Sequence, residues 1–591
     1  MTPKRLISLH WLAILAACGG AQDVAPLEAH SDQPYHVEGV VSFDDFPLAG
    51  VIVSVDGQHH AVRTDHTGQF SFKVHGTGEV TLHAERYGFN DTRLVVDEDR
   101  SSDSILTINM KPTDQVLEAA ANARTQFEEH LPEKEAYLEE LRRLSPKAMP
   151  NVIFILFDDL GYGDLSSYGS QMIDTPAIDA AAKAGALFTD FYAGAPSCTP
   201  SRASFLTGRY PNRSLASNHV FYPDEHPVTL FRRALGYANA LPRDEVTIAE
   251  ILSAVGYRTH MIGKWHLGDV DGNKPLDFGF DGFFGALHSN DMQPFDIYRG
   301  GTLALADGRF DQSDLTRLYT DEAIKLISAE AAEPFFLYFA HTFPHVPHFA
   351  DPDHQGESRA GKYGDVVADL DRSVRRVVQA VERAGVAEET LIIITSDNGA
   401  GTGGSSAPFK GRKGQILEGG MRVPMIALWP GVIESGTEVS AIGIGADLLP
   451  TLTNMLSVPL PQDRMIDGKS LWPVLTGKEK EVHEAIYYFH SRTGEPVAVR
   501  QGPFKYFGAM DEELTLATYP VAGGFQQKFR SPRLYDLSID PLEAHSISTR
   551  EAEVAAQLVM KLAAMREQAR DNPRGWLESS APTTEQDSRI Q

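Results

Sequence analysis

The chain has 591 residues and a mass of 64.8 kDa, more than one ordinary hydrophobic core spans, so we expect two or three domains. Its 42% hydrophobic and 23% charged residues are typical of a globular protein and exclude a largely disordered one. Asp and Glu number 80 against 53 Lys and Arg, and the net charge of -27 would repel nucleic-acid phosphates. We therefore expect no nucleic-acid partner, and any anionic substrate would require a locally basic pocket.

Residues 1–18 have the pattern of an export signal. Lys4 and Arg5 precede an apolar run over residues 6–17 that is too short to span a membrane as a helix. The run ends in L-A-A-C-G, which resembles the lipobox of bacterial lipoproteins, where the cysteine becomes the acylated first residue. This implies an exported protein, lipid-anchored through Cys18 to a bacterial membrane in the periplasm, at the outer membrane or at the cell surface. The alternative is cleavage nearby that leaves Cys18 unmodified.

Residues 19–34 are expected to be a polar tether, and residues 35–112 a small all-β domain. β-rich runs separated by turn residues occur at 37–41, 50–55, 69–74, 79–84 and 105–109. Strands at this spacing predict a β-sandwich. The strings P-L-A-G-V at 47–51 and T-D-H-T-G-Q-F at 64–70 resemble carboxypeptidase-regulatory-like domains. Such a domain would act as a spacer or as a module that contacts carbohydrate or a partner.

The next segments predict a helical linker and then an α/β domain. Residues 113–148 are charged and helical in period, with an interruption at Pro132. From residue 149 to about 480, strands and helices alternate. Apolar runs that predict strands lie at 152–157, 256–262, 334–340, 390–395 and 423–429, and helical patterns lie at 177–183 and 246–255. The alternation predicts a mostly parallel central sheet. Residues 481–571 are expected to be a C-terminal subdomain and residues 572–591 a disordered tail.

Polar clusters follow four of these predicted strands. They are D-D at 158–159, K-W-H at 264–266, H-T-F-P-H-V-P-H at 341–348 and S-D-N-G at 396–399. Because ligands bind beyond the carboxyl ends of parallel strands, we expect these clusters along one edge of the sheet.

The acidic clusters predict a metal site. Asp158, Asp159, Asp397 and Asn398 offer oxygen ligands, which suit Ca²⁺ or Mg²⁺ better than zinc. Two adjacent carboxylates at the end of a buried strand would be costly without a cation, although an Asp pair can also cap a helix. The histidines at 341, 345 and 348 do not predict zinc, because prolines break their spacing and no carboxylate helix completes the pattern.

Cys198 is one of only two cysteines, and its neighbours predict a helix that begins beside it. Pro200 suits the first turn, and Gly208 suits the end. Cys198 would then lie at the helix N-terminus, which favours negative charge, with Arg202 on the same helical face. A reactive group and an anion-binding cation would converge there. The alternative is an inert buried thiol, and the only disulfide that the composition allows, with Cys18, would be removed by lipidation.

Together these motifs resemble the type I sulfatases, the arylsulfatase family. The matching strings are D-D-x-G-Y-G at 158–163, C-x-P-x-R at 198–202 with T-G-R at 207–209, G-K-W-H-L-G at 263–268, P-H-V-P at 344–347, S-D-N-G at 396–399 and K-G-x-x-x-E-G-G at 413–420. They run in the family's order, and L-Y-D-L-S-I-D-P at 534–541 is typical of its C-terminal subdomain. The resemblance implies an alkaline-phosphatase-like α/β core with a mostly parallel sheet and a small antiparallel subdomain.

The resemblance also implies a catalytic group made from the cysteine. In this family a formylglycine-generating enzyme oxidises the cysteine to Cα-formylglycine, whose hydrate attacks the sulfur of a sulfate ester. A calcium ion would bind residue 198 together with Asp158, Asp159, Asp397 and Asn398.

Further residues are assigned roles by the same resemblance. Lys264 and His266 would contact the hydrate and the sulfate, and His345 and Lys413 the sulfate. Arg202 would counter its charge. His345 or Lys413 would protonate the departing alcohol, and His266 would act as the base that releases sulfate. Ser289 falls where some members place a substrate-contacting hydroxyl, with an unrelated turn as the alternative.

The resemblance implies a sulfated carbohydrate or an aryl sulfate as substrate. A first alternative is a phosphonate monoester or phosphodiester hydrolase of the same superfold, and a second is a non-catalytic surface lipoprotein that binds glycans. Residues 214–240 are longer than in a minimal member and could shape the substrate cleft, so substrate preference does not carry over.

Overall fold

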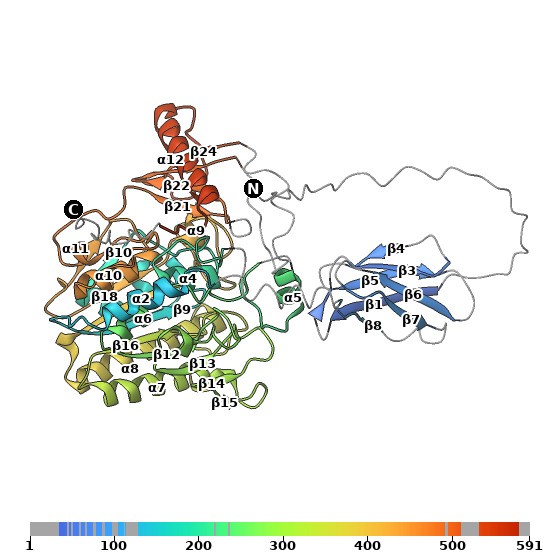
Figure 1. The fold of residues 1–591 in the computed structure, drawn as a ribbon, viewed down its shortest axis with the longest axis horizontal. Coiled ribbons are helices and arrows are strands. Elements are labelled where there is room, and N and C mark those ends of the chain that lie inside the picture. Colours follow the sequence, from blue (N-terminus) through green and yellow to red (C-terminus); the bar gives the residue numbers. More distant parts are fainter. Residues whose placement is uncertain are drawn as a thin grey trace, which may run out of the picture. The chain divides into compact units, whose positions relative to one another are not determined.

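The structure is a computed structural model in which the chain forms two compact units, residues 1–111 and 112–591 (Figure 1). It describes residues 35–577 apart from 44–45, 49–50, 58–60, 65–67, 75–78, 86–88, 97–104, 112, 114–127, 218–219, 235–236, 491–493 and 510–530. The predicted signal, Cys18 and the tether lie outside the described residues. Within the described ranges, no helix combines the length and the apolar character that crossing a membrane requires.

The first unit is the predicted β-sandwich of two four-stranded sheets. One sheet pairs β1 (Tyr35–Phe43) with β2 (Phe46–Pro47), β5 (Gln69–Val74) and β8 (Leu106–Asn109), and the other has the order β4 (Ala61–Arg63), β3 (Ile52–Val55), β6 (Val80–Glu85) and β7 (Thr92–Val96). Alternate residues such as Val53 and Leu82 are buried between the sheets. The period-two pattern of the sequence thus builds a core of its own.

The second unit begins with α2 (Leu131–Leu141), in which Pro132 occupies the first turn. The expected interruption is therefore a helix start, because proline lacks the N–H that the first turn leaves unused. Lys134 of this helix is buried, with its Nζ 2.5 Å from Glu250 Oε1 and 2.8 Å from the Arg243 carbonyl oxygen. These contacts join α2 to α6 (Ile248–Ala254).

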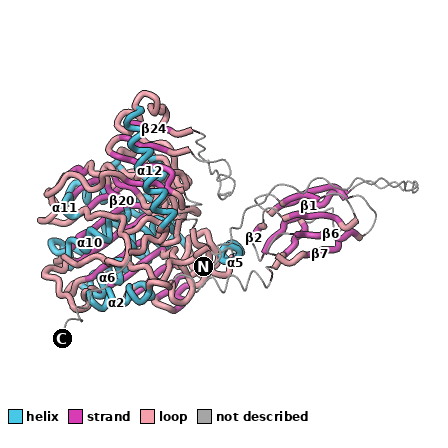
Figure 2. Tube along the Cα trace, turned by 45° about the horizontal axis from the view of Figure 1, so that its top comes forward, coloured by secondary structure: helices cyan, strands magenta, loops and turns pink. Residues whose placement is uncertain are grey.

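A ten-stranded mixed sheet forms the centre of the second unit, which confirms the predicted α/β class (Figure 2). Its parallel centre has the order β13 (Gly282–Ala286), β12 (Arg258–Lys264), β16 (Phe335–Ala340), β9 (Asn151–Phe157) and β17 (Thr390–Ser396). The flanks are β14 (Ile297–Arg299) and β15 (Thr302–Leu305) beside β13, and β18 (Met425–Leu428), β10 (Ala186–Phe188) and β19 (Thr437–Val439) beside β17. Antiparallel pairing begins at the edges of this centre, where β13 pairs with β14 and β17 with β18.

Helices cover both faces of this sheet, which explains the continuous apolar runs of its strands. Ile153 and Ile155 of β9 pack with α3 (Pro176–Ala184), α7 (Leu315–Glu330) and α8 (Gly361–Ala384). Phe154 and Leu156 face the opposite core, formed with α4 (Cys198–Thr207), α6 and α10 (Leu448–Leu456). Shorter elements are β11 (Phe191–Tyr192), β20 (Gly443–Ile444), α5 (Pro227–Ala234), α9 (Glu418–Met421) and α11 (Trp472–Leu475).

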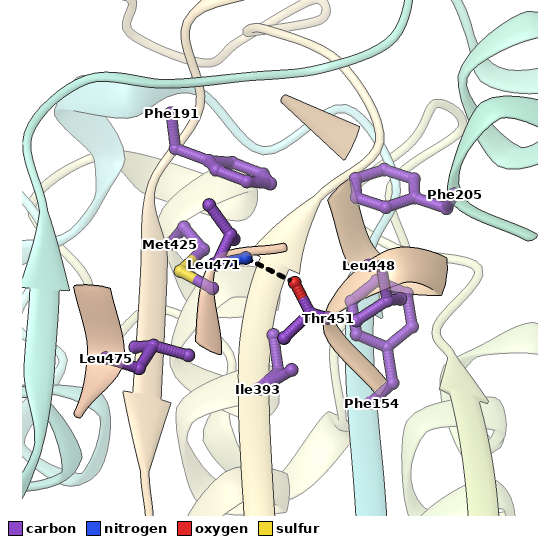
Figure 3. A pocket seen from close by; sticks show the side chains of 9 residues that line it. All are labelled: Phe154, Phe191, Phe205, Ile393, Met425, Leu448, Thr451, Leu471 and Leu475. Carbon is purple, nitrogen blue, oxygen red and sulfur yellow. Dashed lines mark hydrogen bonds between the residues drawn. The ribbon is translucent and has the colours of Figure 1, made fainter. Parts of the chain in front are cut away.

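A small void lies in this second core beside α4 (Figure 3). Its volume is about 10 Å³, and apolar side chains such as Phe154, Phe205 and Ile393 surround it. Such a space barely admits one water molecule and offers it few polar partners. It is a packing gap and not a ligand site.

The C-terminal subdomain is a four-stranded antiparallel sheet, as expected. Its order is β21 (Ile486–Phe489), β22 (Pro496–Gln501), β23 (Phe504–Phe507) and β24 (Arg533–Asp536), and α12 (Ala552–Asp571) packs on it. The disordered tail expected from residue 572 is wrong for residues 572–577, which pack on the large α/β domain. There the guanidinium carbons of Arg209 and Arg464 each lie 5.0 Å from the Trp576 ring centre.

Candidate active site

The polar clusters predicted from the sequence meet at the carboxyl ends of four adjacent strands, β12, β16, β9 and β17. Asp158 and Asp159 follow β9, and Asp397 follows β17; all three side chains are buried. The Asp397 amide donates to the Phe157 carbonyl (3.0 Å), and the Asp159 amide donates to Asp397 Oδ1 (3.1 Å). The parallel pairing therefore sets the spacing of the carboxylates.

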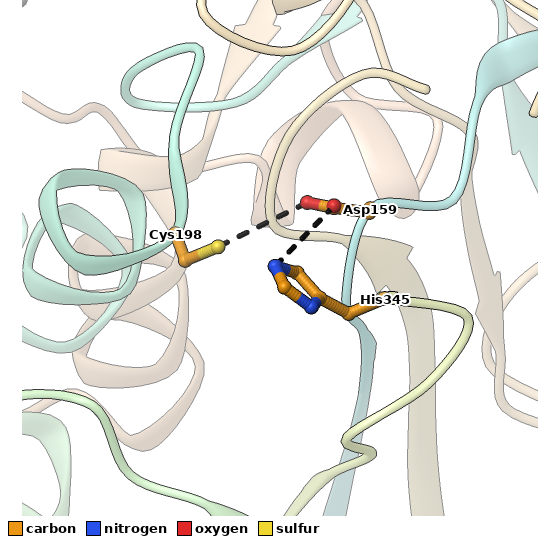
Figure 4. Close-up of side chains that lie close together, drawn as sticks. All are labelled: Asp159, Cys198 and His345. Atoms are coloured by element: carbon orange, nitrogen blue, oxygen red, sulfur yellow. Dashed lines mark hydrogen bonds and ion pairs between the residues drawn. The ribbon is translucent and has the colours of Figure 1, made fainter. Parts of the chain in front are cut away.

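Cys198 is the first residue of α4, at the N-terminus that the sequence predicts. Its Sγ lies 3.3 Å from Asp158 Oδ1 and 3.9 Å from Asp159 Oδ1, and Figure 4 shows the sulfur pointing at the Asp159 carboxylate. The sulfur thus faces charged groups and not the apolar core. Burial and the Asp158 carboxylate raise the pKa of the Cys198 thiol well above its usual value. A thiol held protonated is a weak nucleophile.

Arg202 lies one turn further along α4 and joins two of the clusters. Its Nε donates to Asp397 Oδ2 (2.9 Å), and its Nη1 donates to the Lys264 carbonyl (2.6 Å). Arg202 is fully buried. Burial alone would lower its pKa, but the carboxylates of Asp397 and Asp158 raise it, so the guanidinium stays charged inside the cluster.

Lys264 and His266 both reach the site, and they do so from different backbone conformations. β12 ends at Lys264, and His266 has a left-handed backbone with φ of 61°. Lys264 Nζ lies 2.5 Å from Asp158 Oδ2, and neither ring nitrogen of the buried His266 has a hydrogen-bond partner. Burial and the nearby Lys264 hold the pKa of His266 well below its usual value, so the ring is neutral. Unpaired buried groups of this kind mark sites that bind a further molecule or ion.

His345 and Lys413 approach Asp159 from two further loops. His345 Nε2 lies 3.7 Å from Asp159 Oδ2 (Figure 4), and its Nδ1 donates to the Val346 carbonyl (2.5 Å). Lys413 Nζ lies 2.8 Å from Asp159 Oδ1, and a quarter of the Lys413 side chain is exposed. Lys413 therefore lies at the solvent-facing side of the buried carboxylates, with its ammonium group on Asp159. Burial would lower the pKa of Lys413, but the Asp159 carboxylate outweighs it and raises that pKa well above its usual value.

Ser289 also belongs to this site. Its Oγ accepts from Lys264 Nζ (3.1 Å) and lies 3.5 Å from His345 Nδ1. Of the three histidines in the 341–348 segment, His345 alone contacts the carboxylate pair. His341 pairs with Ser373 Oγ (3.2 Å), and the His348 ring packs 5.3 Å from that of Tyr363, measured between ring centres.

Sequence reasoning missed His288 and Asp269. His288 Nε2 lies 3.0 Å from Asp269 Oδ2, and the His288 ring meets the His266 ring edge-on with centres 6.4 Å apart. Both residues adjoin strings that the sequence singled out: His288 precedes Ser289, and Asp269 follows G-K-W-H-L-G. That adjacency was the available signal, but only the fold shows which neighbour points inward.

The site fits a hard divalent cation. One ligand atom from each of Asp158, Asp159, Cys198 and Asp397 lies within 4.8 Å of the others, and Asn398 Oδ1 is buried without a hydrogen-bond partner. Burial and the Asp158 carboxylate raise the pKa of Asp397 to about 7, because the carboxylates crowd one another at this edge of the sheet. Oxygen donors, crowded carboxylates and an orphaned carbonyl oxygen are what Ca²⁺ or Mg²⁺ would satisfy.

Comparison with known proteins places this site in a family. Residues 150–458 match the Sulfatase family model, and residues 412–568 match the model of the N-sulphoglucosamine sulphohydrolase C-terminal region. Arylsulfatase A of Homo sapiens is 35% identical over 435 residues, 67% of this chain and 83% of that protein. N-acetylgalactosamine-6-sulfatase of Mus musculus is 35% identical over 384 residues, 60% of this chain and 71% of that protein.

Solved structures give the same answer. A chain described under the metabolism of multiple glycosaminoglycans by Bacteroides thetaiotaomicron has a TM-score of 0.63 at 26% identity, covering 71% of this chain and 100% of that one. The PsFucS1 sulfatase from Pseudoalteromonas sp. has a TM-score of 0.63 at 25% identity, covering 78% and 96%.

Proposed function

Because this chain belongs to the sulfatase family and is thus an enzyme that hydrolyses sulfate esters, we propose that residue 198 acts as its nucleophile after conversion to Cα-formylglycine. The observation that carries this proposal is the position of Cys198. Its side chain lies at a helix N-terminus among carboxylates and cations, yet the thiol itself is held protonated. Oxidation by a formylglycine-generating enzyme would replace this poor nucleophile with an aldehyde whose hydrate offers a hydroxyl to the sulfur.

We propose that Asp158, Asp159, Asp397 and Asn398 hold Ca²⁺, with Mg²⁺ as the alternative, next to residue 198. The cation would supply positive charge that orients a sulfate oxygen and favours ionisation of the hydrate. Lys264 and Lys413 flank the same carboxylates, so their ammonium groups would bind the sulfate oxygens and counter their charge, with Arg202 behind them. These cations resolve the contrast between an anionic substrate and a protein of net charge -27.

Two histidines are suited to move protons. His345 donates its Nδ1–H to the Val346 carbonyl, so Nε2 would give a proton to the departing alcohol from the imidazolium form, which the Asp159 carboxylate beside it and the bound sulfate would favour. His266 is neutral with unpartnered ring nitrogens, so it can accept the proton of the residue-198 hydroxyl that must leave as sulfate is released. Ser289 would hold Lys264 and His345 at their places.

We propose a sulfated carbohydrate as the substrate class, with aryl sulfates as the test substrate. Among the similar proteins, one is an N-acetylgalactosamine-6-sulfatase and one concerns glycosaminoglycan metabolism. Membership of the sulfatase family favours sulfate esters over the phosphonate and phosphodiester alternatives. We further propose that the chain is exported, lipid-anchored at Cys18, and that the β-sandwich acts as a spacer or a carbohydrate-contacting module.

Production with and without a formylglycine-generating enzyme tests the nucleophile. Mass spectrometry of the peptide spanning residues 190–213 should show the mass loss of a CH₂SH to CHO change only with the enzyme present. That preparation should release sulfate from 4-nitrophenyl sulfate and turn over phenylphosphonate esters far more slowly. Cys198→Ala should fold normally and release none. Full activity in Cys198→Ala, or in protein that retains the thiol, would rule out the proposed nucleophile.

A further inference from the structure

The loop that carries Lys413, here the Lys413 loop (residues 410–420), is attached to the site at one end. The Lys413 amide donates to the Ala400 carbonyl (3.0 Å), and the Gly414 amide donates to the Pro196 carbonyl (2.6 Å), two residues before Cys198. Both bonds are made by backbone groups. They fix where the Lys413 side chain starts relative to residue 198.

The Lys413 loop is closed tightly on itself, so its far end cannot shift independently. The Gly419 amide donates to the Lys410 carbonyl (2.8 Å). A Cβ on Gly420 would lie 1.9 Å from the Gln415 carbonyl oxygen, and one on Gly419 would lie 2.4 Å from that of Gly411. With no free space between the two arms, movement of residues 416–420 moves Lys413.

The far end of the loop is held by the C-terminal subdomain. Lys505 Nζ on β23 donates to the Ile416 carbonyl (2.9 Å) and to Glu418 Oε1 (2.9 Å). Glu543 Oε2, beyond β24, accepts from the Glu418 amide (2.8 Å), and its Oε1 lies 3.1 Å from Lys505 Nζ. All these charged side chains are buried.

The chemistry of this contact is specific. Lys505 bonds the carbonyl and Glu543 the amide of two loop residues, Ile416 and Glu418. Tyr192 Oη donates to the other oxygen of the Glu418 side chain (2.5 Å). Stability alone would be served as well by apolar packing, because buried ion pairs seldom repay their desolvation. Glu543 also has a left-handed backbone, with φ of 50°, a cost that accompanies functional positions.

We propose that Lys505 and Glu543 are positioning residues that act through Lys413: the C-terminal subdomain clamps the Lys413 loop and so sets the position of the Lys413 ammonium at Asp159. The inference rests on the proposed role of Lys413 in binding the sulfate. It assigns a part in the reaction to a subdomain whose described side chains form no hydrogen bond or ion pair with Asp158, Asp159 or Asp397.

A double-mutant cycle tests the clamp against a purely structural role. Lys505→Met with Glu543→Gln removes the two opposite charges together, while the Glu418 carboxylate keeps the Tyr192 hydroxyl (2.5 Å) and Arg422 Nη1 (3.4 Å) as partners. With formylglycine-containing enzyme and 4-nitrophenyl sulfate, this pair should lower kcat between about 10- and 100-fold. In a Lys413→Ala background the same pair should cost no more than about twofold, because the group it positions is already gone. Equal losses in both backgrounds would overturn the proposal.

Leu534→Ala is the matched control. Leu534 is buried in β24 and packs toward α12, so its loss destabilises the same subdomain without touching the Lys413 loop. Its melting temperature should fall at least as far as that of the clamp pair while kcat stays unchanged. A loss of kcat as large as that of the clamp pair would also overturn the proposal.

Hydrogen–deuterium exchange tests whether Lys505 and Glu543 hold the Lys413 loop, and this test does not depend on the proposed reaction. The peptide over residues 410–421 should exchange faster in the clamp variants than in the wild type. Its exchange should be faster in Glu543→Ala than in Glu543→Gln, because glutamine keeps an acceptor for the Glu418 amide. Leu534→Ala should leave this peptide unchanged. Absence of sulfatase activity in the wild type would defeat the proposed function alone, whereas unchanged exchange in the clamp variants would defeat the clamp.

Discussion

Asp159 and His266 have left-handed backbones, with φ of 71° and 61°, and neither is glycine. Each such conformation costs about 1 kcal/mol or more and persists only where the surroundings impose it. Both residues lie in the candidate active site, where the buried carboxylates of Asp158, Asp159 and Asp397 crowd together. At the scale of single residues, the left-handed backbones of Asp159 and His266 lower the stability of the fold in order to hold the site in its geometry.

The proton donor can be identified by the leaving group. His345→Asn should lower kcat about 100- to 1000-fold on phenyl sulfate, because its phenolate is a poor leaving group that needs a proton. On 4-nitrophenyl sulfate, whose phenolate leaves unaided, the same variant should lose less than about tenfold. Lys413→Ala should affect both substrates equally, because it removes charge and no proton. Equal losses for His345→Asn on the two esters would contradict the assignment.

Asp164 should make stability depend on pH. It accepts from the amides of Gly161 and Ser405 (2.8 Å each) and from Tyr363 Oη (2.5 Å), and burial, opposed by these bonds, raises its pKa to about 6. The folded state therefore binds the proton more tightly than the unfolded state, whose pKa is near 3.8. The contribution is fully present below that value and is lost as pH rises through about 6.

Asp164→Asn isolates this contribution, since asparagine does not titrate. The difference in unfolding free energy, wild type minus variant, should fall by about 3 kcal/mol across this pH range. Urea titrations at a series of pH values measure it. A difference that stays constant or rises with pH would contradict the raised pKa.

At the scale of elements, the site depends on strand order. Four neighbouring strands of the sheet are parallel, so the loops that follow them lie at the same edge; they are β12, β16, β9 and β17. The N-terminus of α4 brings Cys198 to this edge. The Lys413 loop completes this ring from beyond β17. Gly419 and Gly420 explain the E-G-G end of the motif, because a side chain at either position would meet backbone atoms.

Gly420→Ala tests the packing of this loop. The added Cβ would lie 1.9 Å from the Gln415 carbonyl oxygen and 2.5 Å from that of Arg412, so the loop must open. We expect a stability loss of about 2 kcal/mol or more and a kcat reduced at least about tenfold. Gly301→Ala, where a Cβ meets nothing within 4 Å, is the control. A fully active Gly420→Ala enzyme would show that the loop tolerates opening.

At the scale of the whole molecule, the chain separates into two units, and every site residue that the structure describes lies in the second. Because the protein has a net charge of -27, any attraction of an anionic substrate comes from the few cations of the site, Lys264, Lys413 and Arg202, and not from the overall field. Small substrates should therefore depend on the second unit alone.

Removal of residues 1–111 tests this independence. The remaining chain, residues 112–591, should hydrolyse 4-nitrophenyl sulfate with kcat/KM within about twofold of the full protein, because a domain with its own core folds alone. Melting curves show whether the truncated chain is folded. A folded truncation with kcat/KM reduced beyond about tenfold would show that the sandwich takes part in catalysis.

The sequence by itself determined the features that depend on neighbouring residues. Apolar runs with a polar residue at their end predicted β9 and β17 with Asp158 and Asp397, and proline, glycine and helical spacing placed Cys198 at the start of α4. The same local reasoning also brought Lys413 and His345 to the site, through motifs. Such features are legible because strand burial and helix ends are set within a few residues of chain.

The tertiary structure alone decided the contacts between distant segments. It gave His266 the left-handed backbone that points its ring into the site, and it paired His288 with Asp269. It also placed Glu543 as the acceptor for the amide of Glu418, 125 residues away. No local pattern encodes these pairs, because each depends on which elements pack together and at what register. The physical reason is that hydrogen bonding and charge pairing at a buried site are satisfied across the fold, whereas periodicity reports only which face of an element is buried.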